Sequence, residues 1–282
     1  MTSNTIRNQT FDEERALYGL RDALVSACVF AGPADGESAL KEGRGIEVRD
    51  CTFSLRYPLW HDQGFLLADS RLDEKTRAPI WYSENGTIEN TVIEGVKCLR
   101  ECRNVKLKNV TAVSPEFGWQ CRDIGMRDCT VTSEYFLFGT ENAEIGHLDL
   151  TGKYSFQYTK NVTISDSELK TKDAFWHAQN VTVQNSVIKG EYLGWYSDGL
   201  TLIGCTISGT QPLCYCKNLT LIDCRMENTD LSFEYSDVNA SIFGSVLSVK
   251  NPKSGTIIAD SYGEVLFTDD TVIPCLGKVL TR

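Results

Sequence analysis

Five tryptophans recur at one position of a repeating sequence: Trp60, Trp81, Trp119, Trp176 and Trp195. The residue that follows each of them carries a polar or ionisable group: His61, Tyr82, Gln120, His177 and Tyr196. Flat aromatic rings beside polar groups suit sugar rings, because the C–H faces of a sugar stack on the aromatic rings while its hydroxyls form hydrogen bonds. The pattern predicts a saccharide-binding stripe, to which Tyr158 also belongs.

Charged residues are concentrated in the N-terminal half of this stripe: Lys41, Glu42, Lys97, Arg100, Glu101 and Glu116. His61 or Glu101 could act as a general base, with Arg100 or Lys41 stabilising developing negative charge. The alternative is a solvated row of ion pairs, such as Lys41 with Glu42 or Arg100 with Glu101. Whether the protein is an enzyme is open; the expected class is a hydrolase or lyase acting on a small saccharide.

The stripe is positioned by a repeat of 19 residues, which begins again at Asn161, Asn180, Gly199 and Asn218. The first position holds Asn, Asp or Gly, which tolerate a left-handed turn, and the second and fourth positions are apolar, as in a short strand. A second apolar pair lies at positions 7 and 9, and a third strand is expected near positions 14–18. Three stacked strands per coil predict an all-β, right-handed parallel β-helix of about twelve coils over residues 22–254.

Position 15 of the repeat is mostly apolar, as in Leu59, Ile80 and Leu99, and position 16 holds the tryptophans. Alternation along a strand directs position 15 inward and position 16 outward. The alternative is that the tryptophans belong to the core or lie beneath the N-terminal segment. Residues 1–21 are expected to form an N-terminal cap, with a short amphipathic helix or an irregular strand over 11–20. Residues 255–282 are expected to form a C-terminal cap, and the whole chain, 1–282, a single domain.

The composition limits the partners. A net charge of −10 argues against nucleic acid, and no apolar run is long enough to span a membrane. The first residues lack a secretory signal, so we expect a cytoplasmic protein whose 11 cysteines are reduced thiols. We expect no cofactor and no metal site, because His61 and His177 lie six repeats apart and the cysteines lack zinc-site spacing. The cysteines at position 7 are interpreted as small core residues: Cys28, Cys51, Cys129, Cys205 and Cys224.

The coils resemble the pectin-lyase-like superfamily of right-handed β-helices. Four stretches are similar to an uncharacterised bacterial β-helix family, a domain of unknown function: Glu14-Arg-Ala-Leu-Tyr-Gly19, Asp35-Gly-Glu-Ser-Ala-Leu-Lys-Glu42, Tyr57-Pro-Leu-Trp60 and Arg77-Ala-Pro-Ile-Trp-Tyr82. The resemblance implies a fold and no established activity. The residues of pectate lyases and polygalacturonases do not carry over, because the chain has neither an acidic ladder for calcium nor paired catalytic aspartates.

Two hypotheses follow. In the first, the protein binds or acts on a carbohydrate through the aromatic and charged stripe. In the second, it is a non-catalytic scaffold that assembles through a sheet face or an end, and a homo-oligomer is then possible. Fold alone does not decide between them, because function depends on the site.

Overall fold

The computed structural model describes residues 4–282, and these residues form strands and turns without helices. The chain divides into two compact units, Met1–Glu144 and Ile145–Arg282. The single domain expected over residues 1–282 stays a prediction. None of the described residues forms a helix that is long and apolar enough to cross a membrane.

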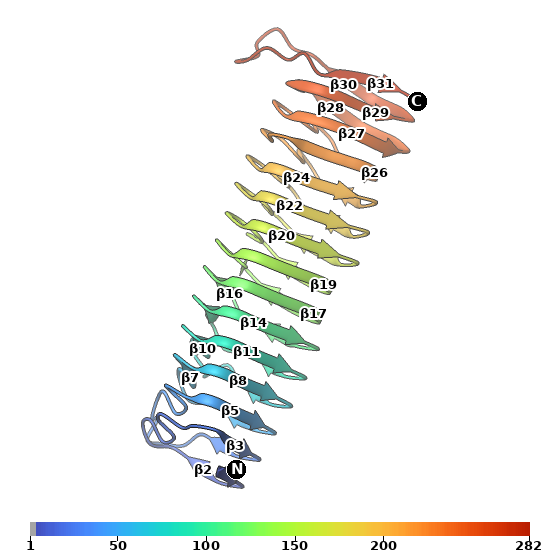
Figure 1. The fold of residues 1–282 in the computed structure, drawn as a ribbon. Helices are drawn as coiled ribbons and strands as arrows, with labels where there is room; N and C mark the ends of the chain where they lie inside the picture. Colours follow the sequence, from blue (N-terminus) through green and yellow to red (C-terminus); the bar gives the residue numbers. More distant parts are fainter. Residues whose placement is uncertain (1–3) are drawn as a thin grey trace. The chain divides into compact units, whose positions relative to one another are not determined.

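The strands of the first unit, in chain order, are β1 (Asn4–Arg7), β2 (Thr10–Phe11), β3 (Ala23–Ser26), β4 (Val29–Phe30), β5 (Arg44–Arg49), β6 (Thr52–Phe53), β7 (Leu59–Trp60), β8 (Gln63–Ala68), β9 (Arg71–Leu72), β10 (Ile80–Trp81), β11 (Glu84–Glu89), β12 (Val92–Ile93), β13 (Cys98–Arg100), β14 (Arg103–Lys108), β15 (Thr111–Val113), β16 (Glu116–Trp119), β17 (Arg122–Ser133) and β18 (Tyr135–Phe136). They stack in three parallel series, visible as successive rungs in Figure 1. One series is β1, β3, β5, β8, β11, β14 and β17. The second is β2, β4, β6, β9, β12, β15 and the end of β17, and the third is β7, β10, β13, β16 and β18. The predicted right-handed parallel β-helix is confirmed, with side chains at equal positions stacked along the axis.

The second unit contains most of β19 (Glu141–Gly152), then β20 (Lys160–Ser165), β21 (Glu168–Thr171), β22 (Gln179–Gln184), β23 (Val187–Lys189), β24 (Asp198–Ile203), β25 (Thr206–Ser208), β26 (Leu219–Glu227), β27 (Asp237–Phe243), β28 (Ser245–Lys250), β29 (Ser254–Ala259), β30 (Ser261–Leu266) and β31 (Lys278–Thr281). Its third face differs from the prediction: turns occupy 155–158, 174–177 and 193–196 in place of strands. Phe175 and His177, on either side of Trp176, have φ of 60° and 54°, so the extended backbone is interrupted on both sides of the tryptophan. Leu99 and Glu101 flank Arg100 with similar angles, and there β13 still pairs as a strand, so these angles alone do not cause the difference.

Both segments predicted as caps take part in the winding. At the N-terminus β1 pairs with β3 and β2 with β4, and Phe11 stacks on Phe30 at 5.2 Å between ring centroids. Residues 14–19 form turns, neither the helix nor the strand that was expected there. At the C-terminus β31 pairs with β29 and β30 with β28.

Small polar side chains hold the corners of the coils. At position 7, the hydroxyl of Ser70 donates to the carbonyl of Ala68 (2.7 Å) and accepts the N–H of Cys51 on the preceding coil (3.1 Å). The Cys205 thiol likewise donates to the carbonyl of Ile203 at 3.5 Å. All the cysteines are free thiols, and all but Cys275 are buried. The position-7 cysteines are therefore buried as predicted, and they also satisfy backbone groups that the corner leaves unpaired.

Candidate functional site

The predicted orientation of the tryptophans is confirmed. Leu59, Ile80 and Leu99 at position 15 are fully buried, whereas the five tryptophans at position 16 are half-buried and face outward. We call position 16 the tryptophan column and position 17, the next residue of each coil, the corner column.

The faces of the indole rings are covered by their neighbours in the column. Trp60 and Trp81 stack on each other at 5.5 Å, and Trp176 and Trp195 do so at 5.4 Å. Trp119 stacks on the Phe138 ring at 4.4 Å. The faces on which a sugar ring would stack are thus taken by other side chains, and the tryptophan column offers mainly ring edges to a ligand.

Cations occupy the remaining faces in the first unit. The Lys41 ammonium lies 4.0 Å from the centre of the Trp60 ring. The Arg100 guanidinium lies between Trp81 and Trp119, 5.8 and 5.4 Å from the two rings. Such contacts stabilise each cation in place. Both cations are thus held in place, and the suggested role of Lys41 and Arg100 in stabilising developing negative charge stays a prediction.

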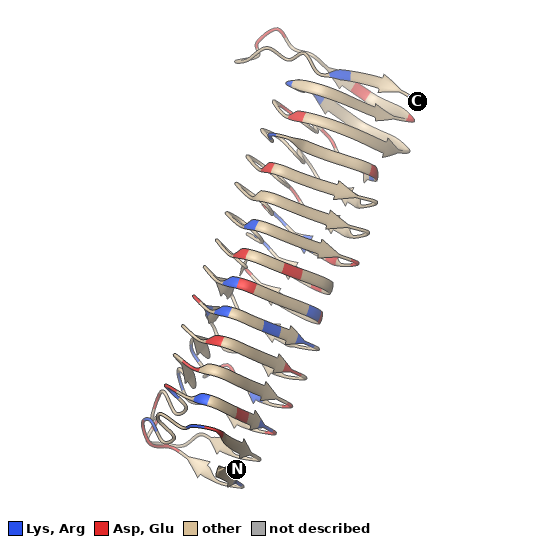
Figure 2. Ribbon diagram, viewed as in Figure 1, with Lys and Arg blue, Asp and Glu red and all other residues tan. Residues whose placement is uncertain are grey.

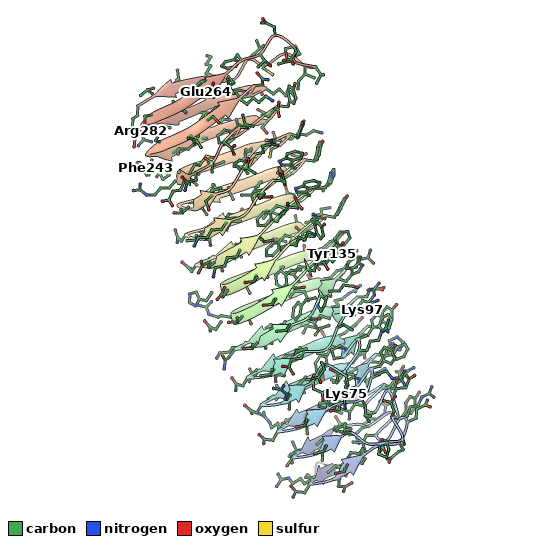
Figure 3. All side chains as sticks on the ribbon, turned by 180° about the vertical axis from the view of Figure 1, so that it is seen from behind. Lys75, Lys97, Tyr135, Phe243, Glu264 and Arg282 are labelled. Atoms are coloured by element: carbon green, nitrogen blue, oxygen red, sulfur yellow. The ribbon has the colours of Figure 1, made fainter. Side chains whose placement is uncertain are left out.

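An ion-pair network continues beside the tryptophan column. Glu116 accepts a hydrogen bond from Arg100 at 3.2 Å and lies 3.9 Å from the Lys97 ammonium, and Glu101 lies 3.9 Å from Arg100. Lys97 projects from the same edge as Tyr135, whose ring packs on Trp119 (Figure 3). The alternative of an ion-pair row is thus observed for Arg100 with Glu101.

The corner column is the more accessible of the two. Glu42, His61, Tyr82, Glu101 and Gln120 all have φ between 51° and 64°. Their left-handed backbones are held by ladder hydrogen bonds, such as those from the N–H of His61 to the carbonyl of Trp81 (3.0 Å) and from the N–H of Gln120 to that of Phe138 (2.8 Å). The surrounding coils thereby impose a conformation that such residues rarely adopt, and the side chains project from the corner one coil apart.

Glu42, Arg44 and His61 form a hydrogen-bonded cluster on this corner. One carboxylate oxygen of Glu42 lies 3.0 Å from Nδ1 of His61, and the other accepts a hydrogen bond from Arg44 at 3.1 Å. Arg44 also donates to the carbonyls of Gly43 (2.9 Å) and His61 (2.6 Å). Burial disfavours the charge on Glu42, but His61 and Arg44 together outweigh it and lower the pKa of Glu42. Glu42 is therefore a fixed carboxylate.

Asp62 lies inside the same corner and is fully buried. One of its oxygens accepts the N–H of Gly43 at 2.6 Å, and the other has no partner among the described residues. Burial is the main cause that raises the pKa of this carboxyl well above its usual range, although the Gly43 N–H and the Arg44 charge oppose the shift.

A shallow groove of about 390 Å³ follows the corner column of the first unit. Its lining residues are Tyr82, Glu84, Glu101, Cys102, Arg103, Gln120, Cys121, Arg122, Gly139 and Glu141. Gly139 has no side chain at the corner, and this widens one end. The Tyr82 hydroxyl donates to Glu101 at 3.3 Å, and burial together with the Glu101 charge raises the pKa of Tyr82.

Charged residues of both signs stand at the starts of the strands beside the groove (Figure 2): two arginines, Arg103 and Arg122, lie between Glu84 and Glu141. Arg122 pairs with Glu141 at 3.3 Å. Arg103 forms no ion pair with any residue of 4–282, although Glu84 and Arg122 are its neighbours on the adjacent strands. A guanidinium that is free of a carboxylate is available to a ligand.

Three of the predicted residues line the groove: Tyr82, Glu101 and Gln120. His61 lies one coil before Tyr82, with the ring centroids 5.4 Å apart, and Glu42 lies beside His61. Tyr158, His177 and Tyr196 form a separate ring stack in the second unit, with centroids 5.0 and 5.1 Å apart. The prediction missed Glu84, Arg103, Arg122 and Glu141, which share one position two residues after the corner column. The shared position could have indicated the groove in the sequence, but a polar residue at the start of a strand usually has no role beyond exposure to solvent.

No group of three or more His, Cys, Asp or Glu side chains in the described part of the chain is arranged to hold a metal ion.

A family model described as "Protein of unknown function (DUF3737)" matches residues 4–279. No curated protein matches the chain.

Among solved structures, the catalytic domain of a GH87 alpha-1,3-glucanase has 11% identity and a TM-score of 0.41, covering 99% of this chain and 63% of that domain. The A-module of the Azotobacter vinelandii mannuronan C-5 epimerase AlgE6 has 11% identity and a TM-score of 0.39, covering 99% of this chain and 90% of that module. PfbA, a surface adhesin of Streptococcus pneumoniae, has 11% identity and a TM-score of 0.34, covering 93% of this chain and 72% of that one. This chain thus spans less than two thirds of the glucanase domain.

Proposed function

Because the chain belongs to the DUF3737 family of proteins of unknown function, whose description brings no activity, we propose from the geometry of the groove that the protein binds a saccharide there. The observation that carries the proposal is the convergence of planar polar side chains on one groove: Glu101, Gln120, Arg103 and Arg122, with Tyr82 at one end.

The chemistry of these groups fits sugar hydroxyls. Carboxylate, amide and guanidinium groups each present two polar atoms in a plane, and two neighbouring hydroxyls of a sugar ring can bond to both atoms at once. The groove lies at the lower end of the volume range of ligand pockets, enough for one or two sugar rings. Its walls carry both signs of charge, and this favours a ligand with many hydroxyls over a polyanion.

The tryptophan column has a supporting role in this proposal. Its stacked rings and the cations between them stiffen the coils that carry Tyr82, Glu101 and Gln120. A rigid row of coils keeps the polar groups in place before the ligand arrives, and this reduces the entropic cost of binding.

Calorimetric titration tests the proposal, with maltose, cellobiose, lactose and the methyl glycoside of each as probes. We expect at least one disaccharide to bind together with its methyl glycoside. Arg103→Ala should raise the Kd of both at least tenfold, which corresponds to about 1.4 kcal/mol of binding free energy. Arg127→Ala is the matched control, because Arg127 is an exposed arginine of the same unit outside the groove. If no probe binds, or if both variants weaken binding equally, the proposal is wrong.

A further inference from the structure

The Glu42–His61 pair extends the proposed site toward catalysis, and this inference rests on the proposed saccharide groove. Because the Glu42 carboxylate can only accept a hydrogen bond, the contact at 3.0 Å places the imidazole hydrogen on Nδ1. In the neutral imidazole the other ring nitrogen, Nε2, then carries a lone pair. It forms no hydrogen bond to any residue that the structure describes, and the side chain is 46% exposed.

His61 does not itself line the groove but lies one coil from it. The His61 ring packs against Tyr82, which lines the groove, and Tyr82 is held by its hydrogen bond to Glu101. A base and a protonated phenol therefore stand on adjacent coils at the same corner. The centroids of the two rings are 5.4 Å apart, about the width of one sugar ring.

The carboxylate partner is not a requirement of the fold. His177 occupies the same corner position in the second unit, stacked between Tyr158 and Tyr196, and no carboxylate is within ion-pair distance of it among the described residues. Glu42 is held by Arg44 as well as by His61, so its orientation is fixed before any ligand binds. Orientation of an imidazole by a fixed carboxylate is the arrangement that general-base catalysis uses.

We propose that His61 and Tyr82 open the hemiacetal ring of a reducing sugar bound in the groove and so interconvert its anomers. Nε2 of His61 takes the proton of the anomeric hydroxyl, and the electron pair of that O–H bond forms the carbonyl at C1. The bond from C1 to the ring oxygen breaks, and the ring oxygen takes the proton of the Tyr82 hydroxyl, whose hydrogen bond to Glu101 breaks in this step. Reclosure on either face of the carbonyl returns both protons.

This reaction matches the groups that are present. It needs one base and one acid, with no oxidant, reductant or leaving group. The departing ring oxygen is an alkoxide, a stronger base than a phenolate, so a phenol can protonate it. Glu42 is a positioning residue, because it fixes the tautomer of His61 and stabilises the imidazolium that forms.

Exchange NMR between the α and β anomers of maltose, cellobiose and lactose tests the proposal in a buffer free of phosphate and imidazole. We expect the protein to accelerate exchange of the disaccharide that it binds, and His61→Gln to reduce the protein-dependent rate at least tenfold. Glutamine is a residue that the corner already accepts, at Gln120, so the variant should fold. His147→Gln is the control, because His147 lies in the second unit outside the groove and should leave the rate unchanged.

A second readout separates positioning from a structural role. Nitrogen-15 NMR of His61 should show the Nδ1–H tautomer in the natural protein and a mixture in Glu42→Gln, whose amide can both donate and accept. Binding of a disaccharide and of its methyl glycoside without faster exchange would overturn this inference and leave the proposed function intact. Absence of binding by every probe would overturn both.

Discussion

Replacement of Ser186 by alanine tests whether the buried hydroxyls at position 7 of the repeat hold neighbouring coils together. Ser186 is buried; its hydroxyl donates to the carbonyl of Gln184 at 2.6 Å and accepts the N–H of Ser167 at 3.1 Å. The Gln184 carbonyl also accepts the N–H of Asp166, so it keeps one partner in the variant. The Ser167 N–H loses its acceptor inside the protein. The variant leaves the Ser167 N–H buried without a partner and removes one of the two hydrogen bonds of the Gln184 carbonyl. We therefore expect a loss of about 2 kcal/mol in the free energy of unfolding.

Urea unfolding followed by circular dichroism measures this loss against two matched variants. Ser186→Cys should cost less than about 1 kcal/mol, because a thiol can accept a backbone N–H from the preceding coil, as the Cys121 sulfur accepts the N–H of Cys102 at 3.4 Å at another turn of the repeat. Thr163→Ala, on an exposed face of β20, should change stability by less than about 0.5 kcal/mol. If Ser186→Ala is as stable as the natural protein, or if the cysteine variant is equally destabilised, the corner hydroxyl does not have the role assigned to it.

Three further predictions concern the pH dependence of folding, close backbone packing and the tryptophan column. Because burial raises the pKa of Asp62, the folded protein keeps a proton that the unfolded chain releases, and stability falls as pH rises from the unfolded pKa toward the folded one. Between the two pKa values, this group changes the free energy of unfolding by about 1.4 kcal/mol per pH unit. Asp62→Asn should remove this contribution, and Tm measured over a series of pH values should then fall less steeply; an unchanged pH dependence of Tm would contradict the assignment. Gly190→Ala should lower the free energy of unfolding by about 1–3 kcal/mol, since the new Cβ would lie 2.0 Å from the Thr171 carbonyl oxygen. In Gly125→Ala the new Cβ meets only the Lys106 side chain at 3.6 Å, so this control should be nearly neutral when both variants are unfolded in urea. Trp176→Phe removes the hydrogen bond from the indole N–H to the Tyr192 carbonyl (2.6 Å) and should lower the free energy of unfolding by about 1 kcal/mol. Equal stability of the variant and the natural protein in urea would show that this bond contributes nothing.

The strands could be predicted because the repeat places like residues on like positions. Val162 and Ile164 on β20 align with Val181 and Val183 on β22, and all four are buried. A period of two within each strand and a fixed interval between coils leave only one way to bury these side chains. The N-terminal coil was harder to detect, because few of its residues continue a recognisable column: Ile6 aligns with Val25, and Phe11 stacks on Phe30.

The candidate site was predicted only in part. Alternation indicated correctly that Trp60 and Trp81 face outward, but it does not determine how their rings turn. In the structure the rings stack along the axis, because neighbouring coils bring equal side chains within contact distance and aromatic faces attract one another. The groove depends on Gly139 at the corner and on Arg103 without an ion-pair partner, and both features are set by neighbours that are distant in sequence.

Backbone amide NMR during titration with the disaccharide that binds best in calorimetry tests the central claim most directly. We expect the largest shifts at Glu101, Arg103 and Gln120, with smaller ones at His61 and Tyr82. Shifts centred instead on Tyr158, His177 and Tyr196, or spread evenly over the chain, would contradict a saccharide site in the corner groove.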